Sequence, residues 1–140
     1  MKKILFIAFS ILFLNSCIKK KAIKAEPDLV GTWVSKEGGY YSWLIISSDG
    51  NGKYRTYDYV DNKDFEFSGI TKYSLFESKL YVGDTKFKVI SPISGNTGGV
   101  HSIDARDYNT LNIVNYPVKM KIVLKTSILH GSRVIHFYKI

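Results

Sequence analysis

The sequence predicts an all-β domain over residues 29–140, built as a small antiparallel barrel or as a sandwich. Residues that favour strands, above all Tyr, Ile, Val, Thr and Phe, are frequent in this segment. Turn signals recur at short intervals, and no stretch of useful length has the periodicity of a helix. Short runs separated by closely spaced turns are typical of sandwiches and barrels. No internal linker divides the segment, so we expect one domain.

Turn signals such as Gly38-Gly39 and Gly83-Asp84 separate the expected strands. Each strand is a short run enriched in β-branched and aromatic residues. The glycine-rich interval at 94–109 is expected to be a loop. The expected strands cover residues 30–35, 40–47, 53–60, 65–76, 79–82, 86–93, 111–114, 118–129 and 133–139.

The last two expected strands alternate most clearly between apolar and polar residues. A two-residue turn at Gly131-Ser132 would pair Ile128 with Ile135 and Thr126 with Phe137. This register turns one apolar face to the core and a lysine-rich face to solvent. The apolar face carries Met120, Ile122, Leu124, Ile128, Ile135 and Phe137, and the opposite face carries Lys119, Lys121, Lys125 and Ser127.

Residues 1–16 have the organisation of a secretory signal peptide. Lys2 and Lys3 supply a positive start, and residues 4–14 form an uncharged, mainly apolar run. That run is much shorter than the about 20 residues that a transmembrane helix needs. The sequence therefore predicts export and removal of this segment rather than a permanent membrane span.

The segment Leu14-Asn15-Ser16-Cys17 resembles the lipobox of bacterial lipoprotein precursors. The resemblance implies that the Cys17 thiol takes a diacylglyceryl group, that the signal is cut just before it, and that the acyl chains anchor the protein to a membrane. Cys17 is the only cysteine in the chain, so no internal disulfide can form. Residues 17–28 would then be a lipidated N-terminus and basic tether.

Ile18 stands where Asp retains many lipoproteins in the inner membrane of two-membrane bacteria. The resemblance therefore implies a periplasm-facing anchor in the outer membrane, or on the outer face of the plasma membrane in a single-membrane host. Lys19, Lys20, Lys21 and Lys24 beside the anchor either attract anionic headgroups or form a solvated linker. Export makes nucleic acid a poor partner despite the net charge of +8.

A second resemblance is carried by Gly31-Thr32-Trp33 and the hairpin at residues 49–54, which look like the lipocalin-like domains of bacterial lipoproteins. It implies an up-and-down β-barrel over residues 29–140, with a β-sandwich as the alternative. In lipocalins the Gly-x-Trp motif closes the base of the barrel, and an Arg from near the last strand covers the Trp. The resemblance thus assigns barrel closure to Gly31, Trp33 and Arg133.

The same resemblance implies a binding barrel. We expect Trp43, Tyr57, Tyr59 and Phe87 to line its mouth and to contact a small apolar or amphipathic ligand. The alternative is a protein-binding envelope lipoprotein, such as an inhibitor or immunity protein, that uses the 94–109 loop and exposed tyrosines. Both function classes stay open at this point.

No enzyme activity, metal or cofactor is expected. His101, Ser102 and Asp104 are too close in sequence to form a catalytic triad unless the fold brings them together. The segment 49–60 begins like a calcium loop, but Lys53 places a cation where the third ligand belongs. A hairpin turn is the better interpretation of that segment.

Overall fold

The computed structural model describes residues 21–22, 27–95, 101–127 and 132–140. The expected signal peptide and the lipidation site Cys17 lie outside the described residues, so they stay predictions. Among the described residues, no helix is long and apolar enough to cross a membrane.

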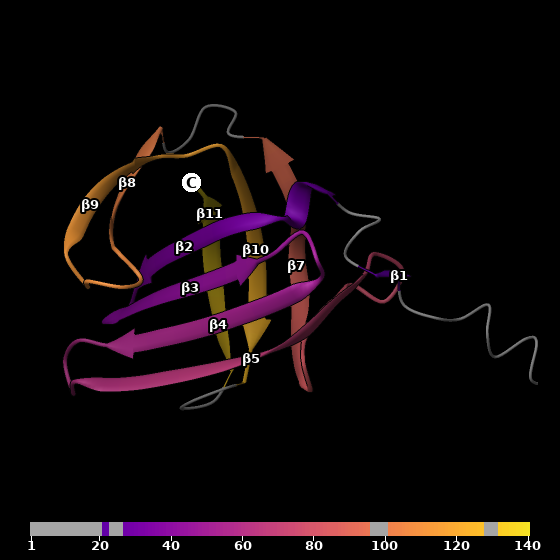
Figure 1. Cartoon of the computed structure of the whole chain (residues 1–140), viewed down its shortest axis with the longest axis horizontal. Coiled ribbons are helices and arrows are strands. Elements are labelled where there is room, and N and C mark those ends of the chain that lie inside the picture. Colours follow the sequence, from indigo (N-terminus) through magenta and orange to yellow (C-terminus); the bar gives the residue numbers. More distant parts are fainter. Residues whose placement is uncertain (1–20, 23–26, 96–100, 128–131) are drawn as a thin grey trace, which may run out of the picture.

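Eight antiparallel strands close into a barrel in which each strand pairs with the next barrel strand along the chain (Figure 1). β11 pairs back to β2, and β5 pairs with β6. The predicted all-β, up-and-down barrel is therefore confirmed in place of the sandwich. The barrel strands are β2 (Gly31–Glu37), β3 (Tyr40–Ile46), β4 (Asn51–Asp58), β5 (Lys63–Ser74), β6 (Lys79–Val82), β7 (Thr85–Gly95), β10 (Met120–Thr126) and β11 (Arg133–Lys139).

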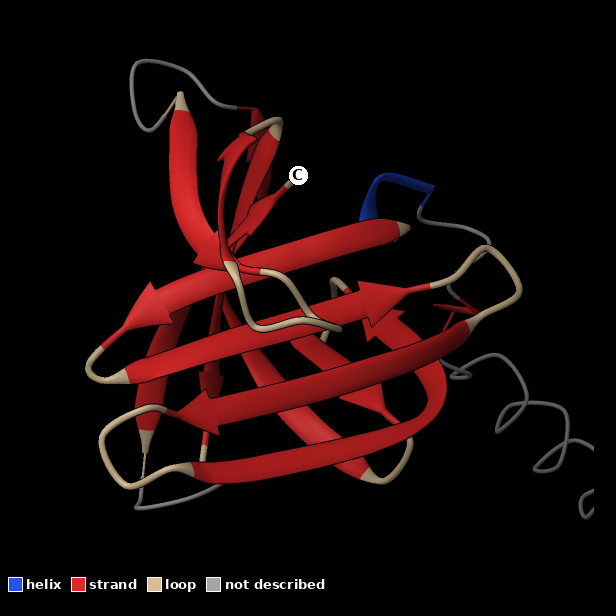
Figure 2. Ribbon diagram, turned by 60° about the vertical axis from the view of Figure 1, so that its left-hand side comes forward, coloured by secondary structure: helices blue, strands red, loops and turns tan. Residues whose placement is uncertain are grey.

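A separate hairpin, β8 (Ser102–Arg106) with β9 (Ile113–Pro117), is inserted between β7 and β10 and lies beside the barrel (Figures 1 and 2). β8 falls in the interval that was expected to be a loop. Ile103 and Ala105 alternate with polar residues and face the outer cluster, but this pattern spans only five residues beside a glycine-rich stretch. The hairpin is the main departure from the expected order of strands.

Two short elements precede the barrel. β1 (Lys21–Ala22) pairs with the end of β5, and η2 (Pro27–Leu29), the one helical turn in the described part, leads into β2 (Figure 2). The backbone N–H of Val30 donates to the Pro27 carbonyl at 3.1 Å, which closes this turn. The chain that precedes the barrel thus approaches it along the end of β5.

The β10–β11 register differs from the prediction by four residues. Ile122 lies opposite Phe137 and Leu124 opposite Ile135, while Thr126 lies opposite Arg133 rather than Phe137. β10 ends at Thr126, five residues before the predicted turn, whereas β11 begins at Arg133, directly after it. Because the shift is even, the same residues still face the core. The predicted face is therefore correct and the predicted pairing wrong; Ile128 lies outside the described residues.

Buried residues form two separate clusters. One fills the barrel; the other lies between the outer face of the barrel and the β8–β9 hairpin. The interior cluster contains Leu29, Trp33, Leu44, Ile46, Tyr54, Tyr73, Leu80, Val82, Phe87, Val89, Ile122, Leu124, Ile135 and Phe137. The outer cluster contains Val34, Tyr41, Trp43 and Ala105.

β5 pairs with two strands in succession: its first part pairs with β4, and its last four residues pair with β6. Gly69 lies where the strand changes partner. A Cβ on Gly69 would stand 2.4 Å from the Cα of Gly83, which has a φ of 59° in the β6–β7 turn. Only a residue without a side chain lets the two backbones approach this closely.

Candidate functional site

Large side chains fill the interior of the barrel. The ring of Tyr54 lies 5.1 Å from the rings of both Phe67 and Phe87, and 6.4 Å from that of Phe137. Thr56 Oγ1 donates to the Tyr54 hydroxyl at 2.6 Å, so the polar end of this tyrosine is also engaged. These side chains bury their surface against one another. The space expected to hold a ligand is occupied by the core.

The four residues expected to line the barrel mouth do not lie together. Phe87 points into the filled interior, whereas Trp43, Tyr57 and Tyr59 lie outside the barrel, on the side that carries the β8–β9 hairpin. The prediction of a shared lining is therefore wrong. The run Tyr40–Ile46 buries side chains on both faces, so alternation could not show which face points inward.

Gly31 and Trp33 meet Lys139 at the end of the barrel where η2 enters. Trp33 is fully buried, as expected, and its Nε1–H donates to the Leu29 carbonyl at 2.9 Å. The β2–β11 register sets Trp33 opposite Lys139, whose Nζ lies 5.8 Å from the centre of the indole ring. A Cβ on Gly31 would stand 2.8 Å from Lys139 Cε. Lys139 takes the place that was predicted for Arg133.

Arg133 lies at the other end of β11. Its guanidinium is 4.2 Å from the centre of the Tyr40 ring, and its Nη2 lies 3.5 Å from Ser42 Oγ. Ser42 Oγ is in turn 3.0 Å from Thr56 Oγ1. Arg133 therefore belongs to a polar group at the opposite end of the barrel, and the expectation that it covers Trp33 is not met.

On the outer face of the barrel, Arg55 contacts the turn that joins β8 to β9. Its guanidinium lies 5.1 Å from the rings of both Trp43 and Tyr108, and it donates to the Tyr108 carbonyl. Arg55 Nη2 also pairs with Asp64 Oδ2 at 2.5 Å. Hydrogen bonding from Arg55 holds the pKa of Asp64 below its usual value, and the same bond raises the pKa of Arg55. Contacts with two rings, a carbonyl and a carboxylate make this guanidinium a fixed part of the surface.

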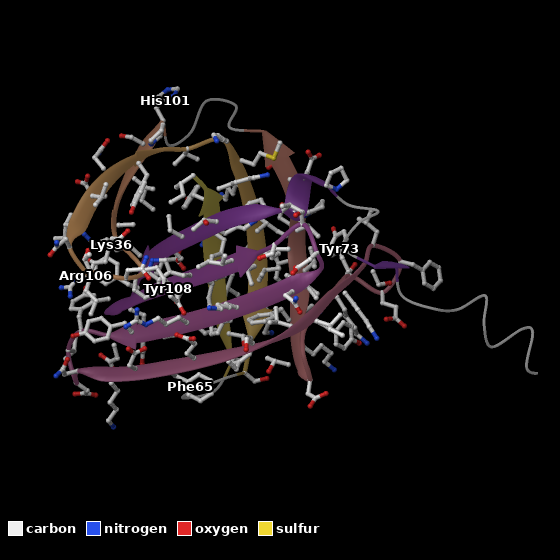
Figure 3. The ribbon with its side chains drawn as sticks, in the orientation of Figure 1. Lys36, Phe65, Tyr73, His101, Arg106 and Tyr108 are labelled. Carbon is white, nitrogen blue, oxygen red and sulfur yellow. The ribbon has the colours of Figure 1, made fainter. Side chains whose placement is uncertain are left out.

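Arg106 makes the corresponding contact from the hairpin side. Its carbonyl oxygen accepts a hydrogen bond from Trp43 Nε1 at 2.8 Å, so an outward-pointing barrel residue holds β8 in place. Figure 3 shows Arg106 close to Tyr108 on the hairpin side of the barrel. The Arg106 guanidinium lies over three tyrosine rings, those of Tyr41 at 4.8 Å, Tyr57 at 5.5 Å and Tyr59 at 5.8 Å.

Tyr108 completes this connection to the barrel. Its hydroxyl donates to Glu66 Oε2 on β5 at 2.5 Å, and its ring meets that of Trp43 edge-on, 5.7 Å between centres. Burial, followed by the hydrogen bond to the Glu66 carboxylate, raises the pKa of Tyr108 to about 12. The phenol therefore stays protonated at neutral pH and acts as a fixed donor.

A cleft of about 740 Å³ lies beside this connection, between the outer faces of β2–β5 and the hairpin. We call it the outer cleft. Its volume falls in the range of small-molecule binding sites. It is lined by Thr32, Val34, Trp43, Ile45, Ser47, Asn51, Gly52, Lys53, Ser68, Gly69, Asp107, Tyr108, Asn109, Tyr116 and Ile140.

The lining combines apolar surface with one cationic side chain. Ile45, Ile140 and the Tyr116 ring supply partly exposed apolar surface, while Lys53 is exposed. Asp107 is the acidic member, but backbone N–H groups of residues 109 and 110 bind its carboxylate and lower its pKa. Its charge is engaged in the turn itself. Lys53 is therefore the group that is free to attract an anionic part of a ligand.

Side chains able to carry out acid–base or metal chemistry are dispersed. His136 Nδ1 lies 2.6 Å from Glu37 Oε1, whereas His101 is exposed at the start of the hairpin (Figure 3). Over residues 27–95, 101–127 and 132–140, no three His, Cys, Asp or Glu side chains gather as metal ligands.

A scan against protein-family models finds no match for this chain, and searches of curated proteins and of solved structures also find none.

Three residues central to this region, Arg55, Arg106 and Tyr108, were not predicted as site residues. Arg55 alternates with inward-facing neighbours on β4, which marks it as outward-facing but does not reveal its contacts with Trp43 and Tyr108. Arg106 and Tyr108 are 51 and 53 residues away from it along the chain. Only the placement of the inserted hairpin brings them together, and nothing in the local sequence encodes that placement.

Proposed function

We propose that this protein is an extracytoplasmic lipoprotein, anchored through Cys17, whose non-catalytic barrel binds a small amphipathic molecule in the outer cleft. The observation that carries the binding part is the cleft itself, with its apolar surface and Lys53 at one side, outside a barrel whose interior is filled. The anchoring part is supported by the lipobox-like segment at residues 14–17.

The lining favours a ligand with an apolar body and a negatively charged head. Ile45 and Tyr116 offer surface to the apolar part, and Lys53 offers its ammonium to the head. Because Lys53 is exposed, the ion pair would add only about a few-fold to the affinity. Most of the binding would come from the apolar contact.

Binding can be tested with dansyl-labelled undecanoic acid as the probe, added to the mature chain, residues 17–140, with Cys17→Ser to avoid detergent. We expect saturable binding that Ile45→Trp abolishes by filling the outer cleft and that Lys53→Gln weakens about threefold. Lys63→Gln, an exposed lysine outside the cleft, is the matched control. Binding that is lost in Phe87→Leu but kept in Ile45→Trp would instead place the ligand inside the barrel.

Anchoring is tested separately by labelling cells with a radioactive fatty acid. The wild-type chain should carry the label and separate with the outer membrane fraction, or with the plasma membrane in a single-membrane host. Cys17→Ala should remain unprocessed and unlabelled. Label that persists in this variant would contradict lipidation at Cys17.

A second candidate is capture of an envelope protein, and one observation favours it. Ile113 is 63% exposed and its neighbour Val114 is 37% exposed on β9, the outer strand of the inserted hairpin. Apolar side chains beside Tyr and Arg are typical of protein interfaces. Under this alternative, Ile113→Lys would abolish capture of the partner, and Ile45→Trp would leave it unchanged.

A further inference from the structure

The β5–β6 turn, residues 75–78, presents apolar side chains to solvent. Phe76 is 101% exposed and Leu75 is 59% exposed. Ser78 N–H donates to the Leu75 carbonyl at 3.2 Å, and Glu77 N–H donates to Ser74 Oγ at 3.1 Å. Hydrogen bonds therefore close the turn while its two apolar side chains project outward. Phe76 and Leu75 thus form a small exposed apolar patch at the tip of a closed turn.

Lysines surround this turn on the outer surface of four neighbouring strands. Each one is adjacent in sequence to a buried residue, so each points away from the core. Lys79 lies opposite Lys88, and Lys88 lies opposite Lys125 on the next strand. We call this surface the basic face; it comprises Lys72, Lys79, Lys86, Lys88 and Lys125.

Like charges in directly opposed positions of a sheet are destabilising. No Asp or Glu among the described residues forms an ion pair with any lysine of the basic face. Val89 N–H donates to the Ser78 carbonyl at 2.7 Å, which ties β7, and with it Lys88, to the apolar turn. The positive charge and the exposed Phe76 are therefore adjacent parts of one surface, which suits an anionic, partly apolar partner.

The tether brings the expected lipid anchor to the same place. β1 pairs with the end of β5, with Lys21 opposite Tyr73 and Ala22 opposite Lys72. Cys17 is four residues before Lys21 in the sequence, a reach of at most about 14 Å. Figure 3 shows Tyr73 on the side of the barrel away from Arg106 and Tyr108. Acyl chains on Cys17 would hold the bilayer beside the β5–β6 turn.

We infer that the β5–β6 turn and the basic face dock on the anionic bilayer that holds the Cys17 acyl chains, with Phe76 inserted at the level of the headgroups. Phe and Leu side chains of interfacial segments lie at the boundary between headgroups and acyl chains, and lysines near an anionic surface each strengthen binding by about fivefold. The inference rests on the proposed anchoring and adds an orientation to it. Docking in this way holds the β8–β9 hairpin away from the membrane.

Insertion can be measured on the acylated chain carrying Phe76→Trp, reconstituted in vesicles of phosphatidylcholine and phosphatidylglycerol. Brominated phosphatidylcholine should quench the new indole, because position 76 is expected to insert among the lipids. Trp33 and Trp43 are buried, so their fluorescence supplies a constant background. The matched control is Ile113→Trp on the hairpin, which should not be quenched. Equal quenching at both positions, or none at position 76, would overturn the inference.

The charge requirement is tested with the unacylated mature chain, Cys17→Ser, by co-sedimentation with the same vesicles. Lys72→Gln, Lys79→Gln and Lys88→Gln combined should weaken binding by about a hundredfold, and Phe76→Ser by about tenfold or more. Unchanged binding in the triple variant would overturn docking through the basic face. Docking would also be overturned if, without vesicles, the protein formed a concentration-dependent dimer that buries position 76.

These outcomes separate the two proposals. A Cys17 that carries no acyl label contradicts the proposed anchoring. In that case, vesicle binding by the unacylated chain still tests whether the basic face and Phe76 dock on a bilayer. A labelled Cys17 together with an unquenched indole at position 76 contradicts the docking alone.

Discussion

Trp43 Nε1 donates a hydrogen bond to the carbonyl oxygen of Arg106 at 2.8 Å, and this contact joins the outer face of the barrel to the inserted hairpin. Trp43 is 1% exposed although it points away from the barrel interior. The hairpin is therefore packed against the barrel by a second small core rather than suspended in solvent, and the outer cleft depends on that packing.

Trp43→Ala should loosen the hairpin as well as destabilise the protein. Removing a buried Trp typically lowers the free energy of unfolding by about 3 to 5 kcal/mol. Hydrogen exchange should accelerate most at amides 102–117. Trp33→Ala is the control, since it removes an equally buried indole from the interior core. In this variant, hydrogen exchange should not accelerate more at amides 102–117 than in the rest of the barrel. Uniform acceleration in both variants would contradict a separate outer core.

Gly69→Ala should destabilise the barrel through a backbone clash. The added Cβ would stand 2.4 Å from Gly83 Cα, and neither backbone can move without disturbing β5 or the β6–β7 turn. We expect urea unfolding to show a loss of about 1 to 3 kcal/mol. Gly95→Ala has open space around the new Cβ and should change stability by less than about 1 kcal/mol. Similar losses at both sites would show that the close approach of the two glycines is not required.

Stability should fall with rising pH through the titration of Tyr108. Its pKa is raised to about 12 in the folded protein, mainly by burial and then by Glu66, against an ordinary value of 10.0. An unfolded chain therefore loses this proton first, so the contribution is complete below pH 10 and is lost as the pH approaches 12. Urea unfolding across this range should show the slope, and Tyr108→Phe should reduce it. Glu66→Gln should lower the pKa without removing the phenol.

Arg55→Lys should alter the response to acid. Asp64 has a lowered pKa because Arg55 binds it, so the pair contributes stability above pH 3.8, and that contribution is lost as the pH falls through the lower, folded-state value. A lysine cannot reproduce the two-pronged bonds to Asp64 and also donate to the Tyr108 carbonyl. The free energy of unfolding lost on the acid side should become smaller, by less than about 1 kcal/mol in total because nearly half of the Asp64 side chain is exposed. An unchanged acid response in Arg55→Lys would show that the Arg55–Asp64 pair does not contribute to the pH dependence of stability.

The sequence by itself determined the class of fold and the direction in which many side chains point. Alternation along residues 120–126 and 133–139 identified Ile122, Leu124, Ile135 and Phe137 as inward-facing, and they are. Alternation has a period of two, so it survives an even shift of register and cannot detect one. This is why the predicted face was correct while the predicted pairing of Thr126 with Phe137 was not.

Only the tertiary structure decided which outward-facing residues are buried and which cations meet which rings. Trp43 and Leu44 are both buried on β3, one against the hairpin and one in the barrel, because a second layer covers the outer face. The β2–β11 register places Lys139 over Trp33 and leaves Arg133 at the far end. Pairings between segments distant in the chain depend on how the whole sheet closes, and local residue patterns carry no record of that closure.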